Sequence, residues 1–384
     1  MSSTVIPETP PATLPAIMTA AVLYGREDVR IEQVPVPRAA AGELIVRVHT
    51  ALTCGTDLKV FRRGYHALMI QPPALFGHEL AGVVAEVGEG VVDFAVGDRV
   101  VPINSAPCGV CYFCARDQEN LCEDLIFNNG AYAEYMRIPA RVVARNTLHV
   151  PAHLPLEYAA LTEPLACALH GFEDSNPHPG DTVAVIGGGP LGLMMVHVAA
   201  LAGCQVIAVV KHDGQAEAAR ALGAVHVVQT SKVDDVTAAV RGLTPDMRGV
   251  DIAIEAVALA ETWEQAVAMV RNGGVVNFFG GPEAGTEVRL DTNRIHYGDI
   301  TLKATFHHTP SICRSAFELI ASGRFDAARF ITGHAPLGDL KQAFAELMNR
   351  SSRPAHIKMA ILPQLVQHES APAEMRKNYA GALG

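Results

Sequence analysis

Four of the eight cysteines lie close together, between residues 108 and 122. Their spacing is two, two and seven intervening residues, in the order Cys108, Cys111, Cys114 and Cys122. A tight loop with this spacing can wrap four thiolates around one tetrahedral zinc ion, and four protein sulfurs leave no open coordination position. The spacing therefore predicts a structural zinc site. A DNA-reading zinc ribbon would need basic surroundings, whereas residues 116–124 contain four acidic residues and one arginine.

A second set of possible metal ligands is dispersed along the chain. Cys54 stands in TCGTD, His78 and Glu79 in GHE, and Glu163 in TEPLA. One sulfur, one nitrogen and two carboxylate donors would make a zinc site with room for water or substrate. A single cysteine or histidine is more often a core or structural residue, and spacing alone leaves the convergence of these four open.

A glycine-rich turn lies between an apolar strand pattern, DTVAVIGGG, and a helical pattern, PLGLMMVHVAALAG. Its G-x-G-x-x-G consists of Gly187, Gly189 and Gly192, with Pro190 and Leu191 between the last two. The first glycine permits a tight turn, the second lets the backbone approach a pyrophosphate, and the third permits close helix–strand packing. The turn therefore predicts a dinucleotide bound at the helix N-terminus.

The second strand of this region, QVIAVV, ends at Val210 and is followed by Lys211. A carboxylate at that strand end would bind the ribose 2′-hydroxyl and repel a 2′-phosphate. Its absence favours NADP over NAD, with Lys211 as a cofactor-binding residue. Asp213 is close enough to keep NAD open, and the alternative is that Lys211 is only a solvated loop residue.

Two patterns divide the chain. From about Met18 to His149, short strand-like segments punctuated by Gly and Pro predict an irregular, mostly antiparallel β domain. After Pro179, strands alternate with helical segments, including the helix TWEQAVAMVRNGG, which predicts a parallel, doubly wound sheet. The fold class is therefore α/β.

Composition excludes several classes of protein. The chain has 384 residues, 49% of them hydrophobic, which predicts a well-packed protein of more than one domain. The net charge of -10 argues against nucleic-acid binding. There is no uncharged apolar stretch of about 18 residues to span a membrane. The N-terminus lacks the basic and apolar regions of a secretion signal, so we expect a cytoplasmic protein.

Taken together, the motifs carry a family resemblance. CGTDLKVF, GHELAGVVAEVGEGVVDFAVGDRVV, the four-cysteine lobe, EPLACALHG and VIGGGPLGLM occur in this order. The chain resembles the zinc-containing medium-chain alcohol dehydrogenase family over about residues 18 to 362, in the branch of sorbitol, other polyol and threonine dehydrogenases. The resemblance implies a GroES-like catalytic domain and a Rossmann domain. We expect a flexible arm at 1–17, the GroES-like domain with its zinc lobe at 18–165, the Rossmann domain at 166–305, a return to the catalytic domain at 306–363 and a tail at 364–384.

The resemblance also implies roles for individual residues. Cys54 and His78 are expected to bind the catalytic zinc, with Glu79 as the third candidate. Glu163 would bind the metal directly or through its water, and the two glutamates can exchange; Cys167, four residues later, is not expected to be a ligand. The four-cysteine lobe would hold a second, structural zinc. A homotetramer or homodimer is implied, formed through the strand ITLKATF.

One position departs from the family pattern. The family's alcohol dehydrogenases often place a proton-relaying histidine five residues after the catalytic cysteine, where this chain has Lys59. Thr56 retains the hydroxyl that contacts the substrate oxygen in the family. The route by which the proton leaves therefore stays open, with His49 or water as candidates.

These features predict a zinc-dependent, NAD(P)-linked dehydrogenase that oxidises a secondary alcohol. Two carboxylates beside one zinc suit a substrate with several hydroxyls, so a polyol or sugar alcohol is favoured over threonine or a simple alcohol. Two further classes stay open: a zinc-independent quinone or enoyl reductase, which would lack the paired Cys54 and GHE residues, and a non-enzymatic NADPH-binding sensor. Candidate pocket segments are Phe61–Ile70, Phe127–Tyr132 and Phe306–Pro310, where His307 and His308 are either pocket residues or exposed loop residues.

Overall fold

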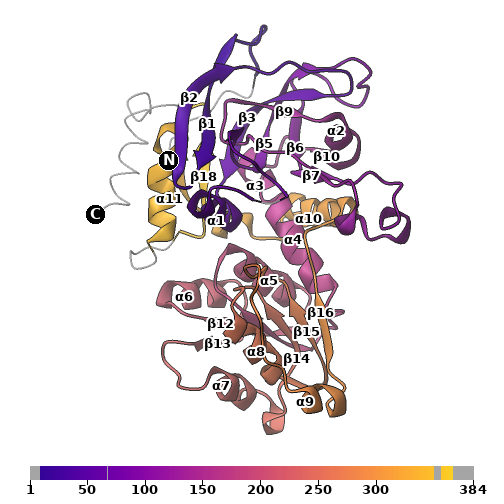
Figure 1. Ribbon diagram of the computed structural model, residues 1–384, viewed down its shortest axis with the longest axis vertical. Coiled ribbons are helices and arrows are strands. Elements are labelled where there is room, and N and C mark those ends of the chain that lie inside the picture. The colour runs from indigo at the N-terminus through magenta and orange to yellow at the C-terminus, as the bar shows by residue number, and fades with distance from the viewer. Residues whose placement is uncertain (1–8, 67, 350–355, 366–384) are drawn as a thin grey trace. The chain divides into compact units, whose positions relative to one another are not determined.

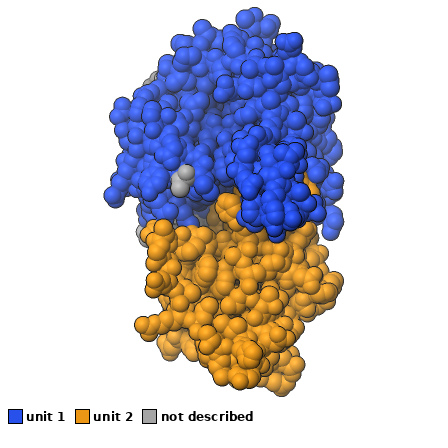
Figure 2. All heavy atoms as spheres, turned by 45° about the vertical axis from the view of Figure 1, so that its right-hand side comes forward, with its two compact units in different colours: residues 1–163, 313–352, 356–384 blue, residues 164–312, 353–355 orange. Residues whose placement is uncertain are grey.

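The computed structural model describes residues 9–66, 68–349 and 356–365 (Figure 1). The chain divides into two compact units, which Figure 2 colours separately. Of the described residues, 9–66, 68–163, 313–349 and 356–365 belong to unit 1, and 164–312 belong to unit 2. Residues 1–8 of the expected arm and 366–384 of the expected tail lie outside the described part. Within it, no helix has the length and apolar character needed to cross a membrane.

Unit 1 is built mainly on antiparallel strands, as the sequence predicts. Its largest sheet has the order β10-β6-β5-β3-β18-β17, and β9 also pairs with β3. These strands are β3 (Leu44–Leu52), β5 (Glu79–Val87), β6 (Arg99–Pro102), β9 (Tyr135–Ile138), β10 (Thr147–His149), β17 (Ile331–Pro336) and β18 (Lys358–Leu362). A three-stranded sheet has the order β2-β1-β4, and two short strands form a separate pair. They are β1 (Ile17–Gly25), β2 (Asp28–Pro35), β4 (Ala74–Leu75), β7 (Ser105–Ala106) and β8 (Ile126–Phe127).

The helices of unit 1 are short. They are α1 (Gly55–Arg63), α2 (Ala140–Asn146), α3 (Leu156–Ala159) and α11 (Leu340–Met348), with 3-10 turns η1 (Cys114–Arg116), η2 (Glu119–Leu121), η4 (Ala327–Arg329) and η5 (Leu337–Asp339). Two longer helices, α4 (Thr162–Glu173) and α10 (Pro310–Ala321), begin in one unit and end in the other. In the core of unit 1, the rings of Phe76, Tyr132 and Phe344 pack edge to face.

Unit 2 contains one parallel sheet with the order β13-β12-β11-β14-β15-β16. Its strands are β11 (Thr182–Ile186), β12 (Gln205–Val210), β13 (His226–Gln229), β14 (Val250–Glu255), β15 (Val270–Phe278) and β16 (Thr301–Ala304). Its helices are α5 (Pro190–Leu201), α6 (Asp213–Ala221), α7 (Val236–Gly242), α8 (Ala260–Met269) and α9 (Thr292–Tyr297), with the 3-10 turn η3 (Pro245–Met247). The central strands are continuously apolar because both of their faces are buried. The predicted α/β class is confirmed.

One predicted helix ends earlier than expected. The pattern TWEQAVAMVRNGG predicts a helix throughout, but α8 ends at Met269 and β15 begins at Val270. Val270 pairs with Val250 of β14, and Gly273 has a φ of 70°. Two consecutive glycines disfavour continuation of a helix, and pairing with β14 stabilises the extended backbone instead.

Candidate metal and cofactor sites

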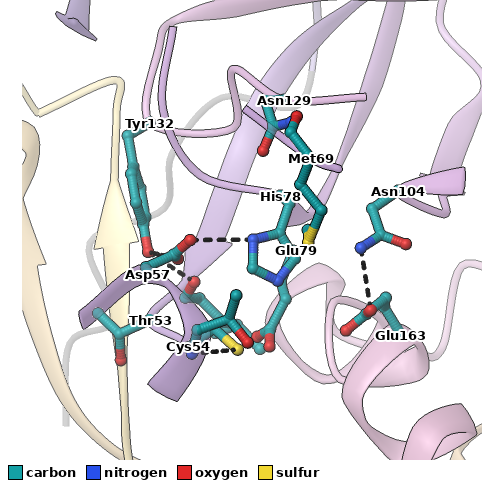
Figure 3. Close-up of polar contacts among 12 residues, drawn as sticks. Thr53, Cys54, Asp57, Met69, His78, Glu79, Asn104, Asn129, Tyr132 and Glu163 are labelled. Atoms are coloured by element: carbon teal, nitrogen blue, oxygen red, sulfur yellow. Dashed lines mark hydrogen bonds and ion pairs between the residues drawn. The ribbon is translucent and has the colours of Figure 1, made fainter. Parts of the chain in front are cut away.

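Three of the four dispersed residues meet at one end of the main sheet of unit 1 (Figure 3). Cys54 follows β3 and caps the N-terminus of α1, while His78 and Glu79 lie where β5 begins. Strands β3 and β5 are antiparallel neighbours, with Leu52 opposite Glu79, so the pairing brings the two segments together. One donor atom from each of the three residues lies within 4.8 Å of the others.

Asp57, in the first turn of α1, orients His78. The Nδ1 atom of His78 lies 2.9 Å from Asp57 Oδ1, and both side chains are buried. A carboxylate accepts hydrogen bonds, so we assign a proton to Nδ1, and Nε2 is the nitrogen that would bind a metal. Burial opposes charge on this imidazole, but Asp57 outweighs it and raises the pKa of His78 well above its usual value. Asp57 was missed in the sequence, although it belongs to the motif that contains Cys54.

Glu79 is held by a buried lysine from the far end of the described chain. Lys358 Nζ donates to Glu79 Oε1 (2.8 Å), Glu79 Oε2 (2.6 Å) and the Thr53 carbonyl (2.9 Å). Burial raises the pKa of Glu79 to about 7, against the opposing effect of Lys358. Burial also opposes charge on Lys358, but Glu79 and the Cys54 sulfur outweigh it and raise the lysine's pKa. Lys358 and Glu79 therefore form a buried ion pair. Nothing in the local sequence marks Lys358 as part of this site.

Glu163 lies nearby but is not part of the close group formed by Cys54, His78 and Glu79. It is buried near the start of α4, and its Oε1 accepts a hydrogen bond of 3.0 Å from Asn104 Nδ2 (Figure 3). Its negative charge contributes to the raised pKa of Glu79. Asn104 was not identified in the sequence. The two glutamates thus differ in their partners: an amide for Glu163 and an ammonium group for Glu79.

The residues considered for proton transfer lie in different environments. Thr56 is half-buried, and its backbone N–H donates to Cys54 Sγ (3.4 Å). Lys59 is exposed, and His49 Nδ1 lies 2.8 Å from Thr50 Oγ1. His66, which sequence reasoning missed, is half-buried; desolvation and the charge of His78 both lower its pKa.

The four clustered cysteines also converge. Their sulfur atoms all lie within 4.8 Å of one another. Backbone N–H groups from Cys114 and Glu123 lower the pKa of Cys111 to about 6, whereas desolvation raises that of Cys114 to about 12. Four thiolates this close together would repel one another. A divalent cation would remove that conflict, so the donor set fits a closed zinc site.

Cys111→Ser is expected to remove one zinc ion from the two per chain that the sequence predicts and to lower the free energy of unfolding by about 4 kcal/mol, as expected for loss of a structural metal. Metal analysis and urea unfolding measure both effects. Cys313→Ser, which changes a buried cysteine outside the cluster, should keep both zinc ions. Full zinc content in Cys111→Ser would contradict the structural role.

The glycine turn has the packing that the fingerprint requires. Gly187 has a φ of 126°, in the left-handed region. A Cβ on Gly192 would lie 2.0 Å from the Gly187 carbonyl oxygen, so only glycine lets α5 approach this closely. Gly189 faces open space, and Pro190 occupies the first turn of α5, where its missing N–H costs nothing. The turn is thus shaped to receive a phosphate group at the helix N-terminus.

The carboxylate of Asp213, which lies soon after the end of β12, already accepts hydrogen bonds from other side chains. Asp213 Oδ1 accepts hydrogen bonds from Lys232 Nζ (2.6 Å) and Gln229 Nε2 (2.9 Å). Lys211 is exposed, its N–H donates to Gln215 Oε1, and its carbonyl accepts from Ser231 Oγ (2.9 Å). The Asp213 carboxylate is therefore already paired with a cation.

His307 and His308 lie close to Cys167 in unit 2, with donor atoms of the three within 4.8 Å. His308 is 2% exposed, so it is not an exposed loop residue, and His307 is half-buried with a φ of 62°. The two imidazole rings lie 3.8 Å apart at 33°.

Comparisons with known proteins match both units. Residues 40–150 match the model described as alcohol dehydrogenase GroES-like domain, and residues 190–322 match the model described as zinc-binding dehydrogenase. Sorbitol dehydrogenase of Bacillus subtilis (strain 168) is 32% identical over 86% of this chain and 94% of its own length. L-threonine 3-dehydrogenase of the same organism is 34% identical over 83% and 91%. A Sinorhizobium meliloti 1021 structure, titled as a zinc-binding dehydrogenase bound to NADP, has a TM-score of 0.83 at 30% identity and covers 91% of this chain and 100% of that one.

Proposed function

Because the chain belongs to the zinc-containing medium-chain alcohol dehydrogenase family, we propose that it oxidises a secondary hydroxyl of a polyol or sugar alcohol to a ketone. It is a zinc-dependent, NAD(P)-linked dehydrogenase. The observation that carries the substrate proposal is the pair of buried carboxylates beside the Cys54–His78 donors, Glu79 and Glu163. Carboxylates accept hydrogen bonds, so they suit a substrate with several hydroxyl donors. Named relatives include a sorbitol dehydrogenase and a D-xylulose reductase, which supports this choice.

We assign the catalytic zinc to Cys54, His78 and one of the two glutamates. The donors fit because His78 Nδ1 is occupied by Asp57, which leaves Nε2 available, and because a donor atom of Glu79 lies within 4.8 Å of both other residues. Direct ligation by Glu79 would require its carboxylate to give up part of its bond to Lys358. Glu163, held by Asn104, is the alternative, directly or through water. The four-cysteine cluster takes the second zinc.

In this mechanism the chain's own residues orient the reactants and move a proton. Bound zinc supplies the Lewis acidity that lowers the pKa of an alcohol, and the nicotinamide supplies the hydride acceptor. Asp57 keeps His78 in one tautomer and one ring orientation. The Thr56 hydroxyl would relay the substrate proton, accepting it while its own proton passes to water. The exposed side chain of Lys59 is not required for this step. The turn at Gly187–Gly192 fixes the cofactor by its pyrophosphate.

We propose NADP as the preferred cofactor. Asp213, the carboxylate that could select NAD, is bound to Lys232 and Gln229. Lys211 directly follows β12 and is exposed, so its positive charge can attract a 2′-phosphate. The NADP-bound relative supports the assignment.

Lys211→Ala is expected to lower kcat/KM for NADP by about 10- to 100-fold, the effect of losing one charge-assisted phosphate contact. The value for NAD should change little, because NAD lacks the 2′-phosphate. Steady-state kinetics with both cofactors test this, with Arg220→Ala in the last turn of α6 as a matched surface-charge control. Equal loss with both cofactors, or no loss with NADP, would contradict the assignment.

A substrate screen with NADP and NAD in parallel tests the function itself. Polyols and sugar alcohols should be turned over faster than threonine and simple secondary alcohols. Preferential oxidation of threonine would replace the proposed substrate class. Reduction of quinones or enones by a protein containing one zinc per chain would favour the zinc-independent reductase instead.

We further propose a cytoplasmic homo-oligomer. Within the described residues no two cysteines form a disulfide, as expected in a reducing compartment. In unit 2, β16 is the last strand at one edge of the sheet and has no strand on its outer side within the described residues. A dimer or tetramer could pair copies of this edge. Light scattering in solution would test the assembly, and a monomer at micromolar concentration would exclude it.

A further inference from the structure

A buried hydrogen-bond chain leads away from His78 to a residue outside the ligand set (Figure 3). Asp57 Oδ1 lies 2.9 Å from His78 Nδ1, and Tyr132 Oη donates to the other carboxylate oxygen, Asp57 Oδ2, at 2.6 Å. The Leu52 carbonyl oxygen, at 3.1 Å from Tyr132 Oη, is a second and more distant acceptor. Tyr132 is 0% exposed, and burial together with Asp57 raises the pKa of its hydroxyl well above the usual value. The hydroxyl therefore stays protonated and able to donate.

The ring and backbone of Tyr132 are fixed without help from its hydroxyl. Gly77, directly before His78, has a φ of 89°, and a Cβ there would lie 2.6 Å from the Tyr132 ring. The Tyr132 N–H donates to the Phe76 carbonyl (2.9 Å), and the ring packs edge to face on Phe76 and Phe344. The aromatic ring thus fills the space beside the segment that carries His78, and a phenylalanine could fill the same space.

We propose that Tyr132 is a positioning residue for the catalytic zinc, because its hydroxyl fixes the Asp57 carboxylate that orients His78. The inference rests on the proposed zinc role of His78. A carboxylate held at one oxygen can turn about its Cβ–Cγ bond, whereas one held at both oxygens cannot. An O–H···O⁻ contact of this length is a strong, charge-assisted hydrogen bond, and both of its groups are buried.

Tyr132→Phe keeps the ring and removes only the hydroxyl. Zinc affinity is measured on the full-length protein by equilibrium competition with a chelator, which reads out metal binding without turnover. We expect the catalytic site to bind zinc about tenfold more weakly, the lower end of the loss seen when partners of metal-bound histidines are removed. The four-cysteine site should be unchanged and serves as an internal control. Tyr135→Phe, at another buried tyrosine three residues along the chain, should retain both affinities.

Combining Tyr132→Phe with Asp57→Asn separates positioning from general destabilisation. If Tyr132 acts through Asp57, the double variant should bind zinc no more weakly than Asp57→Asn alone. Additive losses, an unchanged catalytic-site affinity in Tyr132→Phe, or equal weakening of both zinc sites would each overturn the proposal. Zinc content of the wild-type protein distinguishes this failure from that of the proposed function, which requires two zinc ions per chain.

Discussion

Cys54→Ser is expected to lower turnover by about a thousandfold while the protein stays folded. Lewis-acid stabilisation by zinc contributes several kcal/mol to the reaction, and about 1.4 kcal/mol corresponds to a factor of ten in rate. Serine replaces a soft thiolate ligand with a hydroxyl that is protonated at neutral pH, so the catalytic zinc is lost or held poorly. Steady-state kinetics with the best polyol substrate, metal analysis and circular dichroism measure the three parts of this result.

The appropriate control is a cysteine without a metal role. Cys204 is buried in unit 2, and its Sγ lies 3.6 Å from the His178 carbonyl oxygen. Cys204→Ser should retain turnover and two zinc ions, whereas Cys54→Ser should retain only the zinc of the four-cysteine cluster. Full activity in Cys54→Ser would eliminate the catalytic assignment.

Lys358→Met is expected to destabilise the protein by about 3 kcal/mol or more at pH 8, because it leaves Glu79 buried and without its cation. This loss in the free energy of unfolding should depend on pH. The pKa of Glu79 is already raised to about 7, and loss of Lys358 raises it further above the value of about 4.3 in the unfolded chain. Between these two values the folded state binds more protons than the unfolded state, so the variant loses stability as pH rises. Urea unfolding at pH 5.5 and pH 8 measures the difference.

Two further variants test whether the unpaired charge of Glu79 causes the loss of stability in Lys358→Met. Glu79→Gln combined with Lys358→Met removes both charges and should recover most of the lost stability. Arg329→Met breaks an exposed ion pair with Asp326 (2.6 Å) and should cost less than about 1 kcal/mol. A Lys358→Met variant as stable at pH 8 as the wild type would show that the buried pair contributes no net stability.

Features set by neighbouring residues were predicted well from the sequence. The fold class and the family are confirmed, because strand–helix alternation and the glycine turn depend on residues close together along the chain. The turn needs glycine at 187 and 192 for local steric reasons. The roles of the ligands and the domain boundaries stay predictions.

Features set by strand pairing could not be predicted in this way. Lys358 reaches Glu79 only because β18 pairs with β3, and 279 residues separate the two. Tyr132 was placed in a segment expected to line the pocket, but it lies in the core as the partner of Asp57. A tyrosine in an apolar stretch carries no sequence signal that distinguishes these two environments.

The position of β18 also has a consequence for the order of events during synthesis. The strands of the unit 2 sheet lie between Thr182 and Ala304, so they can pair as soon as that stretch leaves the ribosome. The main sheet of unit 1 is complete only after β18 has been synthesised, because β18 pairs with β3 on one side and with β17 on the other. At typical rates of translation, the 279 residues that follow Glu79, up to and including Lys358, take roughly 15–55 s to add. During that interval Cys54, His78 and Glu79 are already synthesised but the lysine is not, so the site is complete only after Lys358 has been added.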